Sequence, residues 1–221
     1  MKDKLVIFGI GEIGQVAHYY FERQTSQKVA AFTVDAPFVN AESFCGLPLI
    51  AFEDVTRLYP PEEYDMFVAI GYSKLNALRR EKFEAAKALG YTLTSFVSPH
   101  ATVLNDGRIG ENCFIFEDNT IQPFATIGDD VTLWSGNHIG HHSTIGAHTF
   151  IASHAVISGG VKIGEQCFIG VNATLRNHIS IGHRCVIGAG ALILSDAEAE
   201  GVYLGTETER SRVPSSRLRK I

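Results

Sequence analysis

Five of the nine histidines lie between residues 138 and 154, and one of them is crowded by other polar side chains. His141 is followed directly by His142 and preceded closely by Asn137 and His138. Imidazole is the side chain best suited to exchange protons near neutral pH, and crowded titratable groups are typical of a tuned site. His141 is therefore a candidate for acid–base chemistry, with an inert surface histidine as the alternative.

A second candidate site is the glycine-rich segment Gly9-Ile10-Gly11-Glu12-Ile13-Gly14, which Asp35 follows at the end of the next apolar run. Between a strand and a helix, such glycines permit a tight turn and let the backbone approach a diphosphate at the helix N-terminus. A dinucleotide normally needs two mononucleotide-binding halves, and this region has room for one. The pattern favours a nucleoside diphosphate. It leaves open a dinucleotide, or glycines that serve strand–helix packing alone.

The histidines fall within a ladder of aliphatic residues spaced six apart without a slip. Neither the helical period nor the strand period gives a strict six, but a solenoid of short stacked strands does, with one aliphatic side chain per strand filling a central core. Glycine follows many of these residues, as tight turns require. The rungs of the ladder are Val103, Ile109, Ile115, Ile121, Ile127, Leu133, Ile139, Ile145, Ile151, Ile157, Ile163, Ile169, Leu175, Ile181, Ile187 and Ile193.

The residues before the ladder have a different organisation. Apolar runs alternate with segments of helical spacing, a pattern typical of a parallel sheet with helices on its faces. We expect a small α/β domain over residues 1–97, a solenoid over 98–195 and a C-terminal tail over 196–221. The expected strands of the first domain are Lys4–Gly9, Lys28–Val34, Met66–Ile70 and Thr92–Val97, and its expected helices are Glu12–Gln24, Glu53–Tyr59 and Lys74–Leu89.

The composition is that of an ordinary globular protein, 45% apolar and 19% charged, with a net charge of −5. This charge gives no reason to expect nucleic-acid binding, and the apolar runs are too short for a membrane span or a signal peptide. Cys113, Cys167 and Cys185 each fall two residues before a rung, where small core residues are expected. Such cysteine usage favours a reducing compartment, so we expect a cytoplasmic protein.

The ladder has the [Leu/Ile/Val]-Gly-x-x-small-x form of the hexapeptide-repeat acyltransferases, and the chain resembles that family. The resemblance implies a left-handed parallel β-helix of about five coils behind a Rossmann-like α/β half. This layout is similar to that of the bacterial nucleotide-sugar N-acetyltransferases and the related sialic-acid O-acetyltransferases. It implies acetyl-CoA as cosubstrate, a nucleotide-linked amino sugar as acceptor, a homotrimer, no resident metal, and a role in bacterial surface-polysaccharide sugar biosynthesis.

A residue-by-residue match to the family's motifs assigns the two binding sites. The match implies that the nucleotide sugar contacts Gly11, Glu12, Ile13, Gly14, Asp35 and Gly71. It implies that the coenzyme contacts Gly159, Val171, Ala189 and Phe150, the last standing where some members have a histidine. The family's proline-containing motif near the C-terminus is changed here to Gly205-Thr206-Glu207-Thr208-Glu209-Arg210.

The family's catalytic histidine matches His141. An acidic residue often follows that histidine, and here the position is His142, so the partner of the imidazole is changed. Gly159 matches the glycine whose backbone N–H meets the thioester oxygen. Asn137 and His138, which neighbour the catalytic histidine, complete the expected substrate contacts.

The expected reaction is direct transfer of the acetyl group without an acyl-enzyme. His141 takes the proton of the attacking amine, a role typically worth about 10²–10⁴ in rate. The N–H of Gly159 stabilises the oxyanion, and the loss of such a donor typically costs about 10²–10³.

Large aromatic side chains at positions outside the ladder indicate a packed surface, because exposed apolar groups usually mark an interface. Trp134 and Phe150 are the best candidates for contacts between subunits, with burial beneath the N-terminal domain as the alternative. The other aromatic residues of this kind are Phe114, Phe116 and Phe124.

Three alternatives remain at this point. A sugar O-acetyltransferase of the sialic-acid type would use the same fold. A γ-carbonic-anhydrase-like zinc hydratase would bind its metal through His142, His178 and His183. A scaffold or sensor would bind sugar nucleotides without catalysis. The basic tail could meet coenzyme phosphates or be solvated (Arg210, Arg212, Arg217, Arg219 and Lys220).

Overall fold

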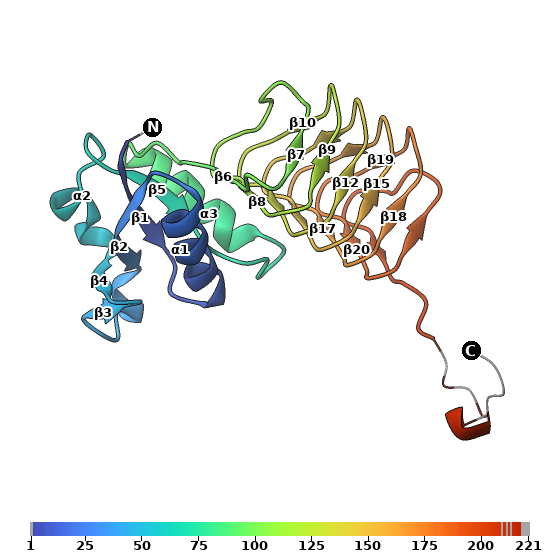
Figure 1. Ribbon diagram of the computed structural model, residues 1–221, viewed down its shortest axis with the longest axis horizontal. Coiled ribbons are helices and arrows are strands. Elements are labelled where there is room, and N and C mark those ends of the chain that lie inside the picture. The colour runs from blue at the N-terminus through green and yellow to red at the C-terminus, as the bar shows by residue number, and fades with distance from the viewer. Residues whose placement is uncertain (1, 209, 211, 213, 218–221) are drawn as a thin grey trace.

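The computed structural model describes residues 2–208, 210, 212 and 214–217. An α/β domain and a column of stacked coils lie side by side along the long axis, and the tail leaves the far end of the column (Figure 1). Arg219 and Lys220 of the predicted basic tail lie outside the described residues. None of the helices within the described ranges has the length and hydrophobicity needed to span a bilayer.

The α/β domain is built on a five-stranded sheet of order β3-β4-β2-β1-β5. Strand β1 is buried on both faces: Leu5 and Ile7 pack with α1, while Val6 and Phe8 pack on the opposite side with α3. This arrangement explains its continuous apolar run. The elements are β1 (Lys4–Phe8), α1 (Glu12–Gln24), β2 (Lys28–Val34), η1 (Ala36–Phe38), β3 (Ser43–Phe44), β4 (Leu47–Ala51), η2 (Phe52–Asp54), α2 (Val55–Leu58), β5 (Asp65–Val68) and α3 (Ala77–Ala88).

Three details of this domain differ from the sequence expectations. The hairpin β3–β4 was not predicted, and β4 adds a further parallel strand beside β2. Helix α3 begins at Ala77 rather than at Lys74, because Lys74, Leu75 and Asn76 have positive φ values of 51°, 52° and 63°. The strand expected over Thr92–Val97 divides: Leu93 bridges to Met66 in the sheet, whereas Phe96–Val97 pairs with the coils.

The column is a left-handed parallel β-helix, as predicted, with two-residue strands that pair with the strand 18 residues away. The domain-facing sheet contains β6 (Phe96–Val97), β8 (Phe114–Ile115), β11 (Thr132–Leu133), β14 (Phe150–Ile151), β17 (Phe168–Ile169), β20 (Val186–Ile187) and β22 (Val202–Tyr203). The open sheet contains β7 (Thr102–Val103), β9 (Thr120–Ile121), β12 (His138–Ile139), β15 (Val156–Ile157), β18 (Thr174–Leu175) and β21 (Leu192–Ile193). The polar sheet contains β10 (Thr126–Ile127), β13 (Thr144–Ile145), β16 (Lys162–Ile163) and β19 (Ser180–Ile181).

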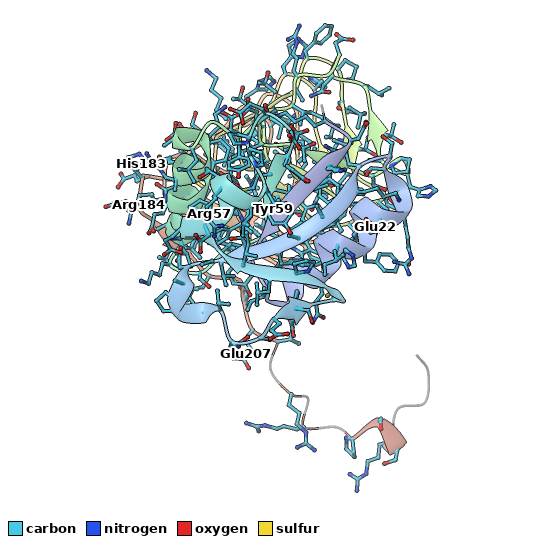
Figure 2. The ribbon with its side chains drawn as sticks, turned by 90° about the vertical axis from the view of Figure 1, so that its left-hand side faces the viewer. Glu22, Arg57, Tyr59, His183, Arg184 and Glu207 are labelled. Carbon is cyan, nitrogen blue, oxygen red and sulfur yellow. The ribbon has the colours of Figure 1, made fainter. Side chains whose placement is uncertain are left out.

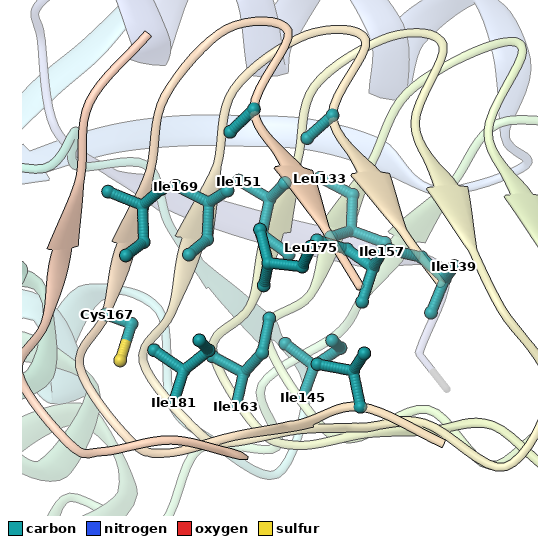
Figure 3. Packing of buried hydrophobic residues seen from close by; sticks show 14 of the residues in the cluster. Leu133, Ile139, Ile145, Ile151, Ile157, Ile163, Cys167, Ile169, Leu175 and Ile181 are labelled. Atoms are coloured by element: carbon teal, nitrogen blue, oxygen red, sulfur yellow. The ribbon is translucent and has the colours of Figure 1, made fainter. Parts of the chain in front are cut away.

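The rungs of the ladder fill the centre of this column (Figure 3). Most of them are fully buried, and the residues two places earlier pack among them, including Cys113, Cys167 and Cys185, all 0% exposed. The prediction that these cysteines are core residues is confirmed. No further coil follows β22 among the described residues, and the tail contains a short 3₁₀ segment, η3 (Ser215–Arg217).

The turns of the column form three corners. The first corner follows the domain-facing sheet (for example residues 134–137), the second follows the open sheet (140–143), and the third follows the polar sheet (146–149). Three residues after most rungs the backbone has a positive φ, as at Asp130 (55°), His142 (58°), His148 (60°) and His154 (60°). Asparagine, aspartate, histidine and glycine tolerate this left-handed conformation best.

A buried polar cluster joins the α/β domain to the column. The side chain of Arg79 on α3 is almost fully buried, and its Nε lies 3.1 Å from Oδ2 of Asp130. The same oxygen lies 2.9 Å from Nδ1 of His148, and Asn112 donates a hydrogen bond to Oδ1 of Asp130 at 2.7 Å. Nη1 of Arg79 has no partner among the described residues, but the hydrogen bonds from its Nε and from Asn112 tie the α/β domain to the column and fix how the domain sits there.

Candidate active site

His141 lies at the second corner, in the turn between β12 and β13, where its side chain is exposed. Its backbone N–H donates to Oε1 of Gln122 at 2.9 Å, which fixes the turn. Its ring atom Nδ1 lies 3.1 Å from Nδ1 of His142. The position where the family resemblance implies an acidic residue is thus occupied by a second imidazole within hydrogen-bond distance.

The His141–His142 contact restricts the tautomers of both rings. One Nδ1 must donate and the other must accept. When His141 donates from Nδ1, its Nε2 has a free lone pair, and His142 carries its own proton on Nε2. The ring of His142 also packs against Phe124, with centroids 4.7 Å apart. Phe124 is therefore a neighbour of the site that sequence reasoning placed only among possible interface residues.

Gly159 lies one coil beyond His141, and the imidazole covers it. A Cβ at Gly159 would approach Nε2 and Cε1 of His141 to 2.6 Å. Glycine is therefore required for this close approach, although its φ is not in the left-handed region. Among the described residues, no acceptor takes the backbone N–H of Gly159, so a free proton acceptor and a free donor lie side by side.

The histidines between residues 138 and 154 have different structural roles. His142, His148 and His154 occupy the left-handed position of their turns, where histidine is favoured for conformational reasons. His148 is also tied to Asp130 beneath α3. His141 has neither role: its backbone φ is not in the left-handed region, and its exposed imidazole lies against Gly159 of the next coil.

Asn137 does not fit its predicted role as a substrate contact. It is 1% exposed, its Oδ1 accepts from the N–H of Ala155 at 2.8 Å, and its Nδ2 donates to the carbonyl of Trp134. Both ends of its side chain thus satisfy the backbone of the first corner. His138 lies on the outer face of the open sheet, between Thr120 and Val156 of neighbouring strands.

Phe150 does not fit the expectation of a coenzyme or subunit contact. Its side chain is 3% exposed and lies beneath the α/β domain, with its ring centroid 5.0 Å from that of Tyr72 and 5.8 Å from the guanidinium carbon of Arg79. The alternative, burial beneath the N-terminal domain, is the observed one. Trp134 is half-buried at the same junction and stacks on Phe116 with centroids 4.5 Å apart.

Val171 and Ala189, the other predicted coenzyme contacts, lie at the first corner. His141 and Gly159 lie at the second corner, so within one chain the two sets are separated by the width of the open sheet. Val171 is 43% exposed and thus available to a ligand or a neighbouring molecule. The six-residue spacing predicts which residues share a corner, but it does not predict on which side of the column the α/β domain lies.

The glycine loop forms the wall of a pocket of about 560 Å³ at the carboxyl edge of β1, β2 and β5. A Cβ at Gly14 would lie 2.3 Å from the carbonyl oxygen of Gly9, whereas a Cβ at Gly11 would meet no atom within 4 Å. Gly14 therefore serves strand–helix packing, and Gly11 borders open space. The predicted residues that line the pocket are Gly11, Glu12, Ile13, Asp35 and Gly71.

Two lysines line this pocket and were missed by sequence reasoning. Lys82 on α3 lies 2.8 Å from Asp35, and Lys74 lies in the left-handed turn before that helix. Burial acts to lower the pKa of Lys82, but hydrogen bonds to Asp35 and Glu81 outweigh it and raise the pKa above its usual value. The pocket therefore holds a fixed positive charge beside an acidic residue, and spacing along the chain carried no signal for this pairing.

The histidines of the zinc alternative do not converge. His142 and His178 lie at the second corner two coils apart, and His183 lies beside Arg184 at another margin of the column (Figure 2). Within the described residues, no three histidine, cysteine, aspartate or glutamate side chains gather closely enough to hold a metal ion.

Comparison with known proteins supports the assignment of the chain as an acyltransferase. The bacterial transferase hexapeptide (six repeats) family matches residues 124–159 and 160–195. A search of curated protein sequences returned no match. Among solved structures, a histidine-to-asparagine variant of perosamine N-acetyltransferase from Caulobacter crescentus, in complex with CoA and GDP-perosamine, is 27% identical with a TM-score of 0.82, covering 91% of this chain and 93% of that one.

Two further structures share the layout. The acetyltransferase domain of PglB from Neisseria gonorrhoeae, in complex with acetyl coenzyme A, is 27% identical with a TM-score of 0.82, covering 93% of this chain and 97% of that one. WeeI from Acinetobacter baumannii is 19% identical with a TM-score of 0.77, covers 91% and 97%, and supports the fold alone. The repeats, the two-part fold and these similarities show that the chain resembles the hexapeptide-repeat nucleotide-sugar acetyltransferases and is an acyltransferase.

Proposed function

We propose that the protein transfers an acetyl group from acetyl-CoA to the amine of a sugar linked to a nucleoside diphosphate. Residues 1–97 would bind the nucleotide and 98–195 would carry out the transfer. The column itself continues to β22 (Val202–Tyr203), which pairs with β20, so the C-terminal tail begins after this strand and not at residue 196. The observation that carries the proposal is the exposed His141 imidazole, which lies within hydrogen-bond distance of His142 and against Gly159, whose N–H has no acceptor among the described residues. A perosamine N-acetyltransferase with the same layout supports the choice of an amine acceptor.

The proposed reaction is a direct transfer. The neutral amine attacks the thioester carbon while Nε2 of His141 takes a proton from the nitrogen, and the N–H of Gly159 donates to the oxyanion. The C–S bond then breaks, the carbonyl reforms, and His141 returns the proton to the departing thiolate. His142 accepts a hydrogen bond from Nδ1 of His141 throughout, so it stabilises the imidazolium as an acidic partner would, but without a full negative charge.

A homotrimer is part of the proposal, and the three faces of the column support it. The α/β domain covers the domain-facing sheet at strands such as β8 and β14, where Phe114 and Phe150 are buried, and the polar sheet presents Lys162 outward. The outer face of the open sheet carries no charged residue and exposes Val156 (40%) and Leu192 (62%). Uncharged, flat surfaces of this kind are typical of subunit contacts.

Three open sheets arranged around a threefold axis would bring the first corner of one subunit beside the second corner of the next. Val171 and Ala189 of one subunit would then face His141 and Gly159 of its neighbour. The residues that are separated within one chain would thus share a single site. This arrangement accounts for the position of the predicted coenzyme contacts at a corner far from the catalytic histidine.

We also propose that the protein acts in the cytoplasm, in the synthesis of sugars for surface polysaccharides. All four cysteines are free, and Cys167 lies one coil from Cys185 without forming a disulfide. Burial raises the pKa of the Cys167 thiol to about 12, which keeps it protonated and unreactive at neutral pH.

The test is an assay of thiol release from acetyl-CoA with a panel of sugar nucleotides. The panel contains GDP-perosamine, UDP-glucosamine, and the matching sugar nucleotides with a hydroxyl in place of the amine. We expect turnover with at least one amine and about 100-fold less with its hydroxyl partner. Faster turnover of the hydroxyl partners would instead establish the O-acetyltransferase, and binding of sugar nucleotides without thiol release would establish a non-catalytic sensor.

A further inference from the structure

A second pocket, of about 350 Å³, lies between helix α1 and the first corner of the column. Tyr19 and Tyr20 line it from the helix, and Glu117, Trp134 and Ser135 line it from the column. The first turn of α1 borders the glycine-loop pocket, and its next turns border this one. At 1.5 Å per residue, the two pockets are separated by only about one helical turn.

Glu117 is the acidic group of this pocket. Its Oε2 accepts a hydrogen bond from the hydroxyl of Tyr20 at 2.7 Å, and its Oε1 accepts one from Ser135 at 2.6 Å. Burial acts to raise the pKa of Glu117, but these hydrogen bonds outweigh it and hold the pKa below its usual value. Each oxygen retains a further lone pair, so a charged acceptor faces a pocket with aromatic walls.

Glu117 also has a defined place along the column. Glu117, Ser135, Ser153, Val171 and Ala189 follow one another at intervals of 18 residues, so they stack in one line along the first corner. Consecutive members are about 4.8 Å apart, the spacing of paired strands. One end of this line lies at the pocket under α1, and the other end holds the predicted contacts of the pantetheine arm.

The proposed trimer places the catalytic histidine at a definite level beside this line. Rotation about an axis parallel to the column leaves heights unchanged, and residue 141 is six positions, or a third of a coil, beyond residue 135. The neighbour's His141 would therefore lie about 1.6 Å beyond Ser135 along the axis. The neighbour's Gly159 would lie between Ser153 and Val171, so acceptor, base, oxyanion donor and coenzyme follow in order.

We infer that this pocket binds the pyranose ring of the acceptor and that Glu117 accepts a hydrogen bond from one of its ring hydroxyls. The inference rests on the proposed function and names the part of the site that selects the sugar. Aromatic walls with a few convergent polar groups are typical of small-ligand sites, and a carboxylate favours O–H donors. An ion pair with the amine itself would keep that amine protonated, which opposes attack, so a hydroxyl is the better partner.

The test compares sugar nucleotides with the bare diphosphates. The dissociation constants of GDP-perosamine, UDP-glucosamine, GDP and UDP are measured calorimetrically for the wild type, Glu117→Gln and Glu117→Asp. The control variant is Glu111→Gln, which removes a carboxylate paired with Lys87 across the same junction but outside this pocket. Thermal unfolding confirms that each variant is folded.

We expect Glu117→Gln to weaken binding of the preferred sugar nucleotide by about tenfold or more, as for the loss of a hydrogen bond to a charged group. Binding of the bare diphosphate should be unchanged, and Glu117→Asp should show a smaller loss. Equal losses for both ligands, or none for either, would overturn the inference, as would a wild type that binds the sugar nucleotides no tighter than the diphosphates. A wild type that binds them but releases no thiol refutes the proposed function instead.

Discussion

The column and the α/β domain position their residues in different ways. In the column, a residue's corner and level follow from its number, because almost every strand pairs with the strand 18 residues away. In the α/β domain, strands of different length are joined by segments of different length, so neighbours in space have no fixed spacing in sequence. The positions of catalytic residues in the column therefore follow its 18-residue repeat, whereas the nucleotide pocket depends on individual turns and side chains.

The largest expected effect is loss of the base at the second corner. His141→Ala should lower turnover by about 10²–10⁴ while coenzyme binding and oligomeric state stay unchanged. Turnover is measured by thiol release, and assembly by light scattering. His142→Ala keeps the base but removes the hydrogen bond to its Nδ1, so a smaller loss is expected. Near-normal turnover of His141→Ala would remove this residue from the mechanism.

The junction between the two regions should give the next largest effect. Asp130→Asn leaves the buried Arg79 without its negative partner, and breaking a buried ion pair typically costs about 3–5 kcal/mol of stability. Glu111→Gln breaks the exposed pair with Lys87 and should cost less than about 1 kcal/mol. Denaturant unfolding measures both. Equal small costs would show that the buried cluster does not hold the domain on the column.

Substitutions at two adjacent glycines of the column, Gly159 and Gly160, should distinguish an effect on catalysis from an effect on backbone stability. Gly159→Ala places a methyl group against the His141 ring at an ordinary φ, so activity should fall by about tenfold or more with little change in stability. Gly160 has a φ of 70°, and its Cβ would meet the ring of His178. Gly160→Ala should therefore cost about 1 kcal/mol of stability. The reverse pattern would contradict the assigned position of the active site.

Substitution of two glycines in the loop of the α/β domain, Gly11 and Gly14, has the smallest expected effect on activity. Gly11→Ala adds a methyl group in open space beside the pocket and should weaken nucleotide binding by about threefold to tenfold without unfolding the protein. Gly14→Ala forces a contact with the Gly9 carbonyl and should cost about 1–3 kcal/mol of stability. Unchanged nucleotide affinity in Gly11→Ala would favour glycines that serve packing alone.

The coil and most helices and strands could be predicted from the sequence, because periodicity records burial directly. Helix α1 and strand β2 have the predicted bounds, and the ladder has the predicted register. The predicted start of α3 at Lys74 was wrong, because the left-handed turn formed by Lys74, Leu75 and Asn76 contains no glycine that would indicate a turn in the sequence. The pairing of Lys82 with Asp35 joins residues 47 positions apart and has no periodic signal.

The candidate site was harder to predict because a motif names residues but not their surroundings. The burial of Phe150 depends on where the α/β domain sits, and that position depends on contacts such as Arg79 with Asp130. The structural role of Asn137 could have been predicted from the sequence, because Asn119 occupies the equivalent position one coil earlier. In the structure, Oδ1 of Asn119 accepts a hydrogen bond from the N–H of Asn137. Buried asparagines that repeat at an 18-residue interval two places before a rung are thus better interpreted as turn structure than as substrate contacts.

Stacking by identical coils also affects how such an enzyme can evolve. Duplication of one 18-residue coil between Ser153 and Val171 would leave the pairing above and below it intact, because each coil contacts only its neighbours. The line of residues along the first corner, from Glu117 to Ala189, would lengthen by about 4.8 Å. A single duplication could therefore make room for a longer acyl donor or a bulkier acceptor. An insertion of similar size within the β1–β5 sheet would instead displace the loops that surround the nucleotide.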